Sequence, residues 1–276
     1  MLSTYHTHNV FCDGQKTPED YVLAAIKKGF SAIGFSSHAP FLFDTGWTMK
    51  RENLSRYIES IKELKEKYSN QIQVYTGLET DFYPNCRDFR NHPGIEYTIG
   101  SVHFMYYNEE NNKSLTVDGP MDEFRELLDS VFDRNVRRLV ETYYDLVAEM
   151  VKTCPPDILG HLDIVKKNNS NSLFFSESHS WYRNKVEEVL DVISKSNVIV
   201  EVNTGGISRG YTAETYPSEW IMKLMRDMDI PVILNSDAHH PDWIDSYYAE
   251  AVEILKRSGY TRQKVLINGN WQDVPL

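Results

Sequence analysis

The sequence predicts a parallel α/β barrel, and three observations lead to that fold class. Short apolar runs alternate with amphipathic helical segments about seven times along the chain, the order expected of β/α units. The runs are nearly continuous in apolar character, as strands covered on both faces are. The length of 276 residues suits a closed or nearly closed barrel. No shift in composition marks a second domain, so we expect one domain over residues 1–276.

The expected strands are short and rich in Ile, Val and Tyr, and they are bounded by polar segments. The first apolar segment of the chain ends at His6 and His8. The strands expected after it are SAIGFSS (31–37), IQVYTGLE (72–79), YTIGSVH (97–103), DILGH (157–161), VIVEVNT (198–204) and PVILNSD (231–237).

The expected helices carry apolar residues at helical spacing. The first has clear start and stop signals, because Thr17 can cap it, Pro18 takes its first helical position and Gly29 ends it. The helical segments cover residues 17–29, 52–68, 121–152, 181–195, 217–228 and 246–257.

Three long polar stretches each follow an expected strand. In a β/α barrel, the loops after the strands gather at the C-terminal face, where active sites are built. We therefore expect these stretches to form walls or lids around a site. They are NEENNKSLTVDGP (108–120), KKNNSNS (166–172) and TGGISRGYTAETYP (204–217).

The charge and cysteine content exclude several classes of protein. Lys and Arg number 29 against 40 Asp and Glu, a net charge of −11, which argues against a nucleic-acid surface. No apolar run approaches the length of a membrane span, and the N-terminus lacks the pattern of a signal peptide. Three cysteines without CxxC spacing predict no disulfide framework. We expect a cytoplasmic protein without nucleic-acid or membrane partners, and the sequence does not indicate its oligomeric state.

Histidines and carboxylates fall where the expected strands end. Because all those ends meet at one mouth of a barrel, residues far apart in sequence would share one pocket. Residues at i and i+2 of a strand point to the same side, so the first two histidines would both point inward. The residues at these ends are His6, His8, His38, Glu79, His103, His161, Asp237 and His239.

Packing six imidazoles with carboxylates would be costly in a merely buried cluster. Metal ions resolve this conflict, because neutral imidazole and carboxylate are ligands for Zn, Mn or Fe. The set exceeds the ligands that one ion takes, so two or more ions are expected. Glu79 could bridge two of them at the separation of about 3.5–4 Å typical of two-metal hydrolases.

Six motifs occur in a fixed order along the chain: YHTHNVFCDG, SSHAPF, GLETDF, GSVHF, GHLD and NSDAH. Together they resemble the PHP (polymerase and histidinol phosphatase) family, most closely its histidinol-phosphate phosphatase branch. The resemblance covers residue 4 to about residue 243. It implies a distorted (β/α)7 TIM-like barrel that holds three divalent metal ions.

The resemblance also assigns ligands, motif by motif, to three metals. Asp13 is informative, because some relatives have His there and an Asp resembles the histidinol-phosphatase type. The implied ligands are His6, His8, Glu79 and Asp237 for the first metal; Glu79, His103 and His161 for the second; and Asp13, His38 and His239 for the third.

The implied reaction is hydrolysis of L-histidinol phosphate to L-histidinol and phosphate, a step of histidine biosynthesis. A hydroxide bridging two metals would attack phosphorus, with Glu79 as the bridging ligand. The general acid stays open between Asp13, His239 and a metal-bound water. Arg209 matches the family position that grips the substrate phosphate, and Arg183 is a weaker candidate for the same task.

The cationic end of such a substrate would need an acidic partner. Charge alone suggests Glu110 or Asp118 in the first polar stretch.

Four alternatives remain beside this function. A PHP phosphoesterase for phosphotyrosine or a nucleotide phosphoester is the nearest of them. A replicase proofreading module is disfavoured, because the chain is acidic and ends without a polymerase body. An amidohydrolase-type deaminase would usually need a bridging lysine, and none stands at the relevant strand ends. A non-enzymatic metal-binding protein would need at least one lost ligand, and all nine positions carry competent ligands.

Overall fold

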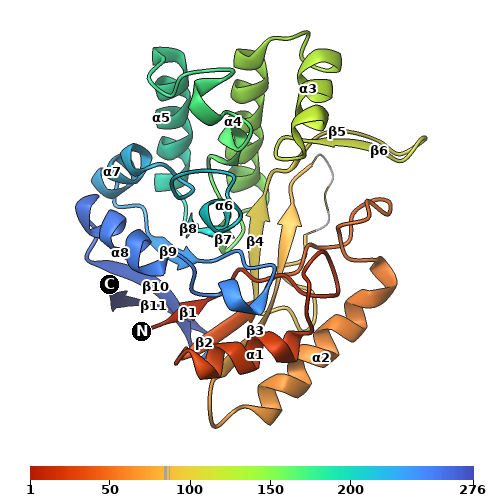
Figure 1. Ribbon diagram of the computed structural model, residues 1–276, viewed down its shortest axis with the longest axis vertical. Helices are drawn as coiled ribbons and strands as arrows, with labels where there is room; N and C mark the ends of the chain where they lie inside the picture. The colour runs from red at the N-terminus through yellow and green to blue at the C-terminus, as the bar shows by residue number, and fades with distance from the viewer. Residues whose placement is uncertain (84–85, 87) are drawn as a thin grey trace.

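The molecule is built around a parallel sheet that curls into a barrel (Figure 1). The computed structural model describes residues 1–83, 86 and 88–276. Within these residues, seven strands pair in parallel in the order β1-β2-β3-β4-β7-β8-β9. They are β1 (Ser3–Thr4), β2 (Ala32–Phe35), β3 (Gln73–Asp81), β4 (Tyr97–Ser101), β7 (Ile158–Leu159), β8 (Ile199–Asn203) and β9 (Val232–Asn235).

The two outer strands of this order meet just beyond their C-terminal ends, and this contact closes the sheet. Thr7 forms a parallel bridge with Ala238. The amide of His8 donates to the carbonyl of Ala238 at 2.9 Å, and the amide of Ala238 donates to the carbonyl of His6 at 3.2 Å. The predicted barrel is therefore confirmed, and each of the six predicted strands overlaps one of its strands.

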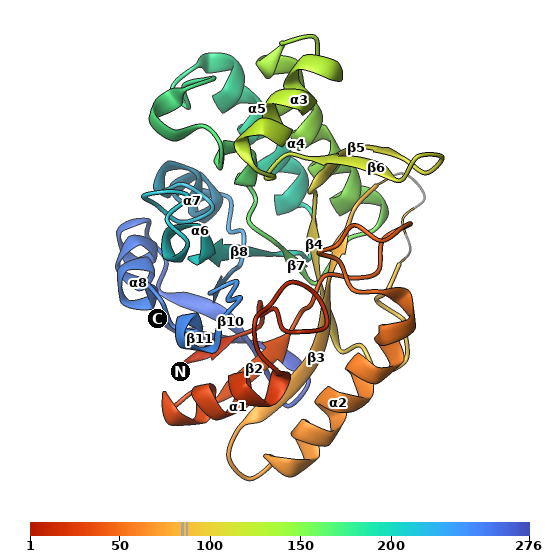
Figure 2. The same cartoon turned by 45° about the vertical axis from the view of Figure 1, so that its right-hand side comes forward.

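Helices cover the outside of the barrel (Figures 1 and 2). The first begins as predicted: the Thr17 side chain accepts from the amide of Asp20, and the Asp20 carboxylate accepts from the amide of Thr17 at 3.0 Å. The covering helices are α1 (Pro18–Lys27), α2 (Leu54–Lys67), α4 (Val136–Thr153), α5 (Ser180–Ser194), α7 (Glu219–Asp227) and α8 (Tyr248–Arg257). Short 3-10 turns lie at η1 (Arg51–Asn53), η2 (Ile164–Lys166), η3 (Ser170–Ser172) and η4 (Pro241–Trp243).

One predicted helix is interrupted in the structure. The segment 121–152 forms two helices, α3 (Met121–Ser130) and α4, rather than one. Asp133 and Arg134 adopt positive φ angles of 52° and 62°, which a continuous helix does not allow. The side chain of Asn135 then caps α4 by accepting from the amide of Arg138 at 3.0 Å.

Aromatic and aliphatic side chains fill the end of the barrel where the strands begin. The Tyr97 ring lies in this interior cluster, and its hydroxyl donates to the carbonyl of Tyr5 at 2.5 Å. A Cβ atom on Gly77 would lie only 2.4 Å from the Tyr97 ring, so glycine leaves the space that the ring occupies. This apolar floor directs any ligand to the opposite end of the barrel.

A C-terminal hairpin that the sequence analysis did not predict closes the same end. Its antiparallel strands are β10 (Arg262–Ile267) and β11 (Asn270–Pro275). Leu266 packs in the barrel-floor cluster, and its carbonyl accepts from the Tyr5 hydroxyl at 3.0 Å. The hairpin therefore seals the floor against solvent.

The three polar stretches lie at the open end, where the strands finish, and all three contribute residues to one cavity. The first includes the turn and second strand of a projecting hairpin, formed by β5 (Phe104–Asn108) and β6 (Lys113–Thr116). The second begins at the last residue of the turn η2 and contains the turn η3, and the third contains the short helix α6 (Gly205–Ser208). The prediction that these stretches form walls is confirmed.

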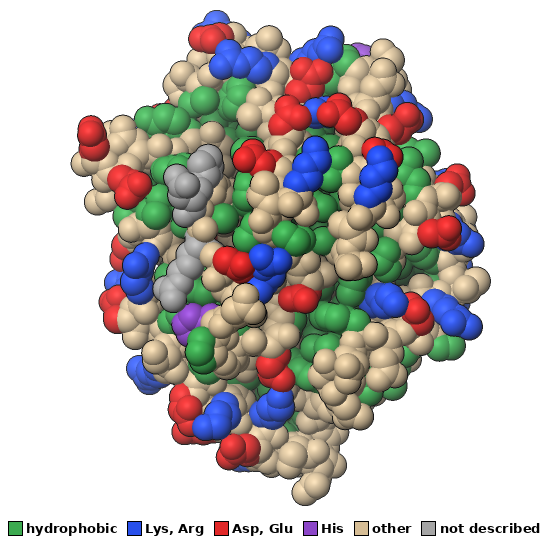
Figure 3. All heavy atoms as spheres, turned by 180° about the vertical axis from the view of Figure 1, so that it is seen from behind, with side chains coloured by type: hydrophobic (Ala, Val, Ile, Leu, Met, Phe, Trp, Pro, Cys, Tyr) green, Lys and Arg blue, Asp and Glu red, His purple; other side chains and the backbone are tan. Residues whose placement is uncertain are grey.

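Acidic and basic side chains are interspersed on the face opposite to that of Figure 1, as Figure 3 shows. Among the described residues, we find no helix with the length and apolar character needed to cross a membrane.

Candidate active site and metal centre

The nine predicted ligands converge at the C-terminal end of the barrel. Six strands lead into them, and the turn after the first adds Asp13. Eight of the nine side chains are at most 17% exposed, whereas that of Asp13 is 32% exposed and lies at the rim. The architecture therefore brings together residues that are more than 200 positions apart in the sequence.

Glu79 lies at the centre of this cluster. Its Oε2 atom is 3.1 Å from Nε2 of His6 and 3.3 Å from Nε2 of His8. Its Oε1 atom is 3.0 Å from Nε2 of His161 and 3.7 Å from Nε2 of His103. The two carboxylate oxygens thus face two different sets of imidazoles, which is the geometry of a ligand shared by two ions.

Asp237 completes the first of these sets. Its Oδ1 atom lies 3.2 Å from Nε2 of His8 and 3.6 Å from Nε2 of His6. The residue has a positive φ of 49°, a conformation that Asp tolerates better than most residues and that is often found at functional sites. This backbone conformation at the end of β9 accompanies the inward position of the carboxylate.

The donor atoms of this set fit a metal ion. Nε2 of His6, Nε2 of His8 and Oε2 of Glu79 are buried and have no hydrogen-bond partner among the described residues. Four ligands around a tetrahedral ion at about 2.0–2.1 Å stand roughly 3.3 Å apart, close to the spacings seen here. Buried polar atoms that converge without hydrogen bonds are explained by a cation between them.

A second group of donors lies nearer the rim. Donor atoms of His8, Asp13, His38 and His239 all lie within 4.8 Å of one another. Oδ2 of Asp13 is 3.2 Å from Nε2 of His239. The turn that carries Asp13 folds tightly back, because a Cβ on Gly14 would lie 2.3 Å from the backbone of His8. This group contains all three residues that the family resemblance assigns to a third metal.

The electrostatics of His8 favour a ligand role. Burial, together with the neighbouring imidazoles of His239 and His38, lowers the pKa of His8 to about 3. His8 is therefore neutral at pH 7, and only the neutral imidazole has a lone pair for a metal.

The electrostatics of His6 and Glu79 favour a positive charge between them. Burial alone would lower the pKa of His6, but the carboxylates of Glu201 and Glu79 outweigh it and raise that pKa well above its ordinary value. Burial would likewise raise the pKa of Glu79, but His6 and His38 hold it well below its ordinary value. A bound cation supplies this positive charge in place of a proton.

Arg209 occupies a position between the ligand cluster and the cavity. Its Nη2 atom donates to Oδ2 of Asp237, and its Nη1 atom donates to the carbonyl of Asp237 and to Nδ1 of His239, each at 2.8 Å. These bonds use three of its five N–H groups, and the residue also lines the cavity. Arg209 can therefore orient two ligands and still contact a substrate oxygen.

The structure does not bring Arg183 to the site. Arg183 is exposed on α5 and its guanidinium lies over the ring of Trp220, 4.7 Å from the ring centroid. It is absent from the described lining of the cavity, so the expected phosphate contact is not supported. Of the two acidic candidates, Asp118 lines the cavity, whereas Glu110 lies exposed in the turn between β5 and β6.

Several site residues were missed by the sequence analysis. Asp81 accepts from the backbone amide of His103 at 3.1 Å, and its Oδ1 atom lies 2.8 Å from Nδ1 of the same histidine. Lys167 pairs with Asp118 and lines the cavity. Glu201 bonds to His6 inside the barrel. Asp81 lies within the GLETDF motif and Glu201 interrupts an apolar strand, so both carried a signal in the sequence.

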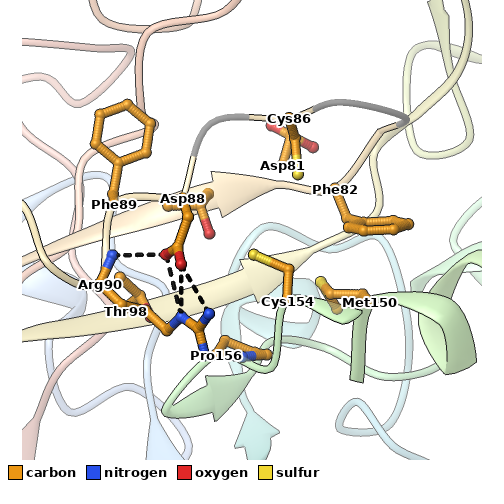
Figure 4. A pocket seen from close by; sticks show the side chains of 11 residues that line it. Asp81, Phe82, Cys86, Asp88, Phe89, Arg90, Thr98, Met150, Cys154 and Pro156 are labelled. Carbon is orange, nitrogen blue, oxygen red and sulfur yellow. Dashed lines mark hydrogen bonds and ion pairs between the residues drawn. The ribbon is translucent and has the colours of Figure 1, made fainter. Parts of the chain in front are cut away.

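The ligand cluster opens into a cavity of about 690 Å³, a suitable size for a small substrate. Trp47, Asp118 and Met121 line its walls beside Lys167 and Tyr211. By contrast, the pocket of Figure 4, between β3, β4 and the end of α4, has a volume of only about 10 Å³. The Asp88–Arg90 ion pair and two free thiols, Cys86 and Cys154, line that pocket, which is too small for a substrate.

Fold and site together define a β/α-barrel protein with a histidine–carboxylate metal centre at the C-terminal ends of its strands. The chain belongs to the PHP domain family, whose model matches residues 4–205. This family membership confirms the predicted resemblance.

Curated relatives match almost the whole chain. A probable histidinol-phosphatase of Deinococcus radiodurans is 30% identical over 265 residues, covering 94% of each protein. The histidinol-phosphatase of Bacillus subtilis is 28% identical over 269 residues, covering 90% of this chain and 97% of the relative. The histidinol phosphate phosphatase of Lactococcus lactis, solved with zinc, L-histidinol and phosphate, shares the fold with a TM-score of 0.71 at 19% identity and covers 98% of both chains.

Proposed function

We propose that this protein is a metal-dependent phosphatase that converts L-histidinol phosphate into L-histidinol and phosphate, a reaction of histidine biosynthesis in the cytoplasm. The observation that carries the proposal is the convergence of nine candidate ligand side chains, with Glu79 at their centre, at the mouth of one barrel. The near full-length match to histidinol-phosphatases supports the substrate. The cofactors would be two or three divalent ions of Zn, Fe or Mn, and residues 1–276 would act as one domain.

When bound, the ions would supply activated water at neutral pH and neutralise the charge of the phosphate. His6, His8, Glu79 and Asp237 would hold one of them. Glu79 would share its other oxygen with the site of His103 and His161, and the rim group of Asp13, His38 and His239 would hold a third.

The leaving alkoxide must gain a proton as the P–O bond breaks. Asp13 and His239 are the most exposed members of the ligand set, and both line the cavity. Their side chains contact each other at 3.2 Å. We propose that the proton comes from this rim, where Asp13, His239 and a water held beside them are the candidate donors.

Arg209 would hold a phosphoryl oxygen, and its replacement by Ala tests this role. We expect kcat/KM of Arg209→Ala to fall by roughly 10- to 100-fold, because a charged contact to phosphate and three hydrogen bonds to two candidate ligands, Asp237 and His239, are lost. Steady-state phosphate release measures the effect. Arg183→Ala is the matched control, since that guanidinium packs on Trp220 outside the cavity, and it should stay within about twofold of wild type. An equal loss in both variants would contradict the assignment.

The substrate assignment is tested by phosphate release from a panel of phosphoesters. The metal-loaded protein should hydrolyse L-histidinol phosphate with a kcat/KM at least about 100-fold above that for phosphotyrosine or a dinucleotide. Histidinol phosphate has a short chain that can bring its ammonium group to Asp118, whereas phosphotyrosine holds its ammonium group beyond a phenyl ring and a dinucleotide lacks one. A higher kcat/KM for phosphotyrosine or the dinucleotide would overturn the assignment of histidinol phosphate as the substrate. Bound metal without any phosphate release would favour a non-enzymatic metal-binding protein.

A further inference from the structure

Strand β8 differs from the other strands of the barrel in what it contributes to the site. Among the seven described strands of the barrel sheet, it alone leads into none of the nine predicted ligands. It carries instead a carboxylate, Glu201, whose side chain is 0% exposed inside the barrel. A fully buried carboxylate is costly unless several hydrogen bonds stabilise its charge. The neighbours of Glu201 therefore indicate what it does.

Four donors surround this carboxylate, two at each oxygen. Oε1 of Glu201 lies 2.7 Å from Nδ1 of His6 and accepts from the side-chain amide of Asn235 at 3.0 Å. Oε2 accepts from the backbone amide of His161 and from the side-chain amide of Asn203, both at 2.9 Å. One side chain thus contacts two predicted ligands, His6 and His161, on opposite sides of the Glu79 carboxylate.

Backbone groups fix the orientation of both asparagines in this network. The side-chain oxygen Oδ1 of Asn203 accepts from the backbone amide of Gly205. Oδ1 of Asn235 accepts from the backbone amide of Tyr5, and both distances are 2.8 Å. Each asparagine must therefore present its NH₂ group to Glu201. The backbone N–H of His161 can also only donate. Three of the four neighbours of Glu201 are therefore fixed as donors.

The fourth neighbour, His6, is then restricted to one tautomer. With an acceptor oxygen at 2.7 Å, Nδ1 of His6 carries the proton. The lone pair of the neutral ring is left on Nε2, the atom that faces Glu79 and Asp237 and has no hydrogen-bond partner among the described residues. A histidine that ligates through one nitrogen while a carboxylate holds the other is a recurring arrangement at metal sites.

We infer that Glu201 is a positioning residue of the metal centre, which fixes the tautomer of His6 and the backbone position of His161 and so tunes the affinity for the metal ions. This inference rests on the proposed function. Glu201 is not among the described residues that line the cavity. It acts through its hydrogen bonds to His6 and to the backbone of His161.

Glu201→Gln tests the inference at nearly constant volume. The amide of Gln would keep its oxygen toward the His161 backbone amide, because that donor cannot reverse, and would turn its NH₂ group toward His6. Nδ1 of His6 would then have to accept, which moves its proton to Nε2 and blocks ligation. We expect the dissociation constant for Zn²⁺ or Mn²⁺ to rise by roughly 10- to 100-fold, as measured by competition with a chromophoric chelator.

Two further readouts separate metal positioning from folding. Addition of metal should raise the Tm of the chelator-treated Glu201→Gln protein less than it raises the Tm of treated wild type. Asp157→Asn is the matched control, because its carboxylate accepts from the amide of Thr98 at 2.8 Å at the other end of the barrel and contacts no predicted ligand. That variant should keep wild-type metal affinity whatever its Tm.

The outcomes distinguish this inference from the proposed function. Wild-type affinity for metal in Glu201→Gln, in a wild-type protein that binds metal and releases phosphate, would overturn the positioning role alone. Equal affinity losses in Glu201→Gln and Asp157→Asn would also overturn it, because they would indicate a general loss of structure. A wild-type protein that binds no Zn²⁺ or Mn²⁺ would overturn both.

Discussion

Glu79→Gln is expected to lower kcat/KM by at least about 10³-fold and to remove at least one metal ion per chain. Loss of an outer partner of a metal ligand already costs roughly 10- to 100-fold, and Glu79 is itself the ligand that faces two sets of imidazoles. The amide nitrogen of Gln cannot ligate a cation, so one half of the shared site is lost. Phosphate release and elemental analysis of the purified variant measure the two effects.

The control for this variant is Glu59→Gln, which removes one carboxylate from an exposed ion pair with Lys62 on α2. Such surface pairs contribute little, so activity and metal content should match wild type. A Glu79→Gln protein that keeps its full metal content and more than a tenth of wild-type kcat/KM would contradict the central position of Glu79.

Removal of the metal ions is expected to abolish activity and to lower Tm by roughly 10 °C. Ions that bind only the folded chain contribute about 4 kcal/mol at 1,000 times their dissociation constant, and 1 kcal/mol shifts Tm by about 2–4 °C in a chain of this size. The physical reason is that His6, His8 and Glu79 keep buried donor atoms without partners when no cation lies between them. Thermal unfolding before and after treatment with a chelator measures the shift.

Re-addition of Zn²⁺, Mn²⁺ or Fe²⁺ to the chelator-treated protein should restore both the activity and the Tm. Comparison of the three ions identifies the one that restores most activity. The exposed-pair variant Glu59→Gln should show the same shift as wild type. Full activity after exhaustive chelation, with an unchanged Tm, would exclude the metal-dependent mechanism.

The fold and the convergence of the nine candidate ligands could be predicted because parallel strands impose a common geometry. Once the seven barrel strands lie side by side, the residues that follow them reach the same mouth. Local signals also worked where the chemistry is local: Thr17 and Pro18 start α1, and Gly29, with a φ of 76°, follows its end.

The remaining features depend on side-chain directions that a linear pattern does not contain. Glu201 gains its role only when β7, β8 and β9 place His161, Asn203 and Asn235 around it. Arg183 packs on Trp220 instead of reaching the cavity, a placement that its position after a polar loop in the sequence does not reveal.

The C-terminal hairpin was missed although its turn is an Asn268-Gly269 pair. Both residues have positive φ angles, of 48° and 76°, which is the typical signal of a two-residue hairpin turn. The break between α3 and α4 is caused by the left-handed backbone conformation of Asp133 and Arg134. The spacing of apolar residues, on which the helix prediction depended, does not detect such a conformation.

Anomalous diffraction from crystals grown with Zn²⁺ or Mn²⁺ tests the central claim most directly, because it locates the ions independently of activity. We expect two or three anomalous peaks, one of them within about 2.0–2.2 Å of Glu79 and of Nε2 of His6. Density for Glu79, His6 and Asp237 with no anomalous peak between them at saturating metal would contradict the account.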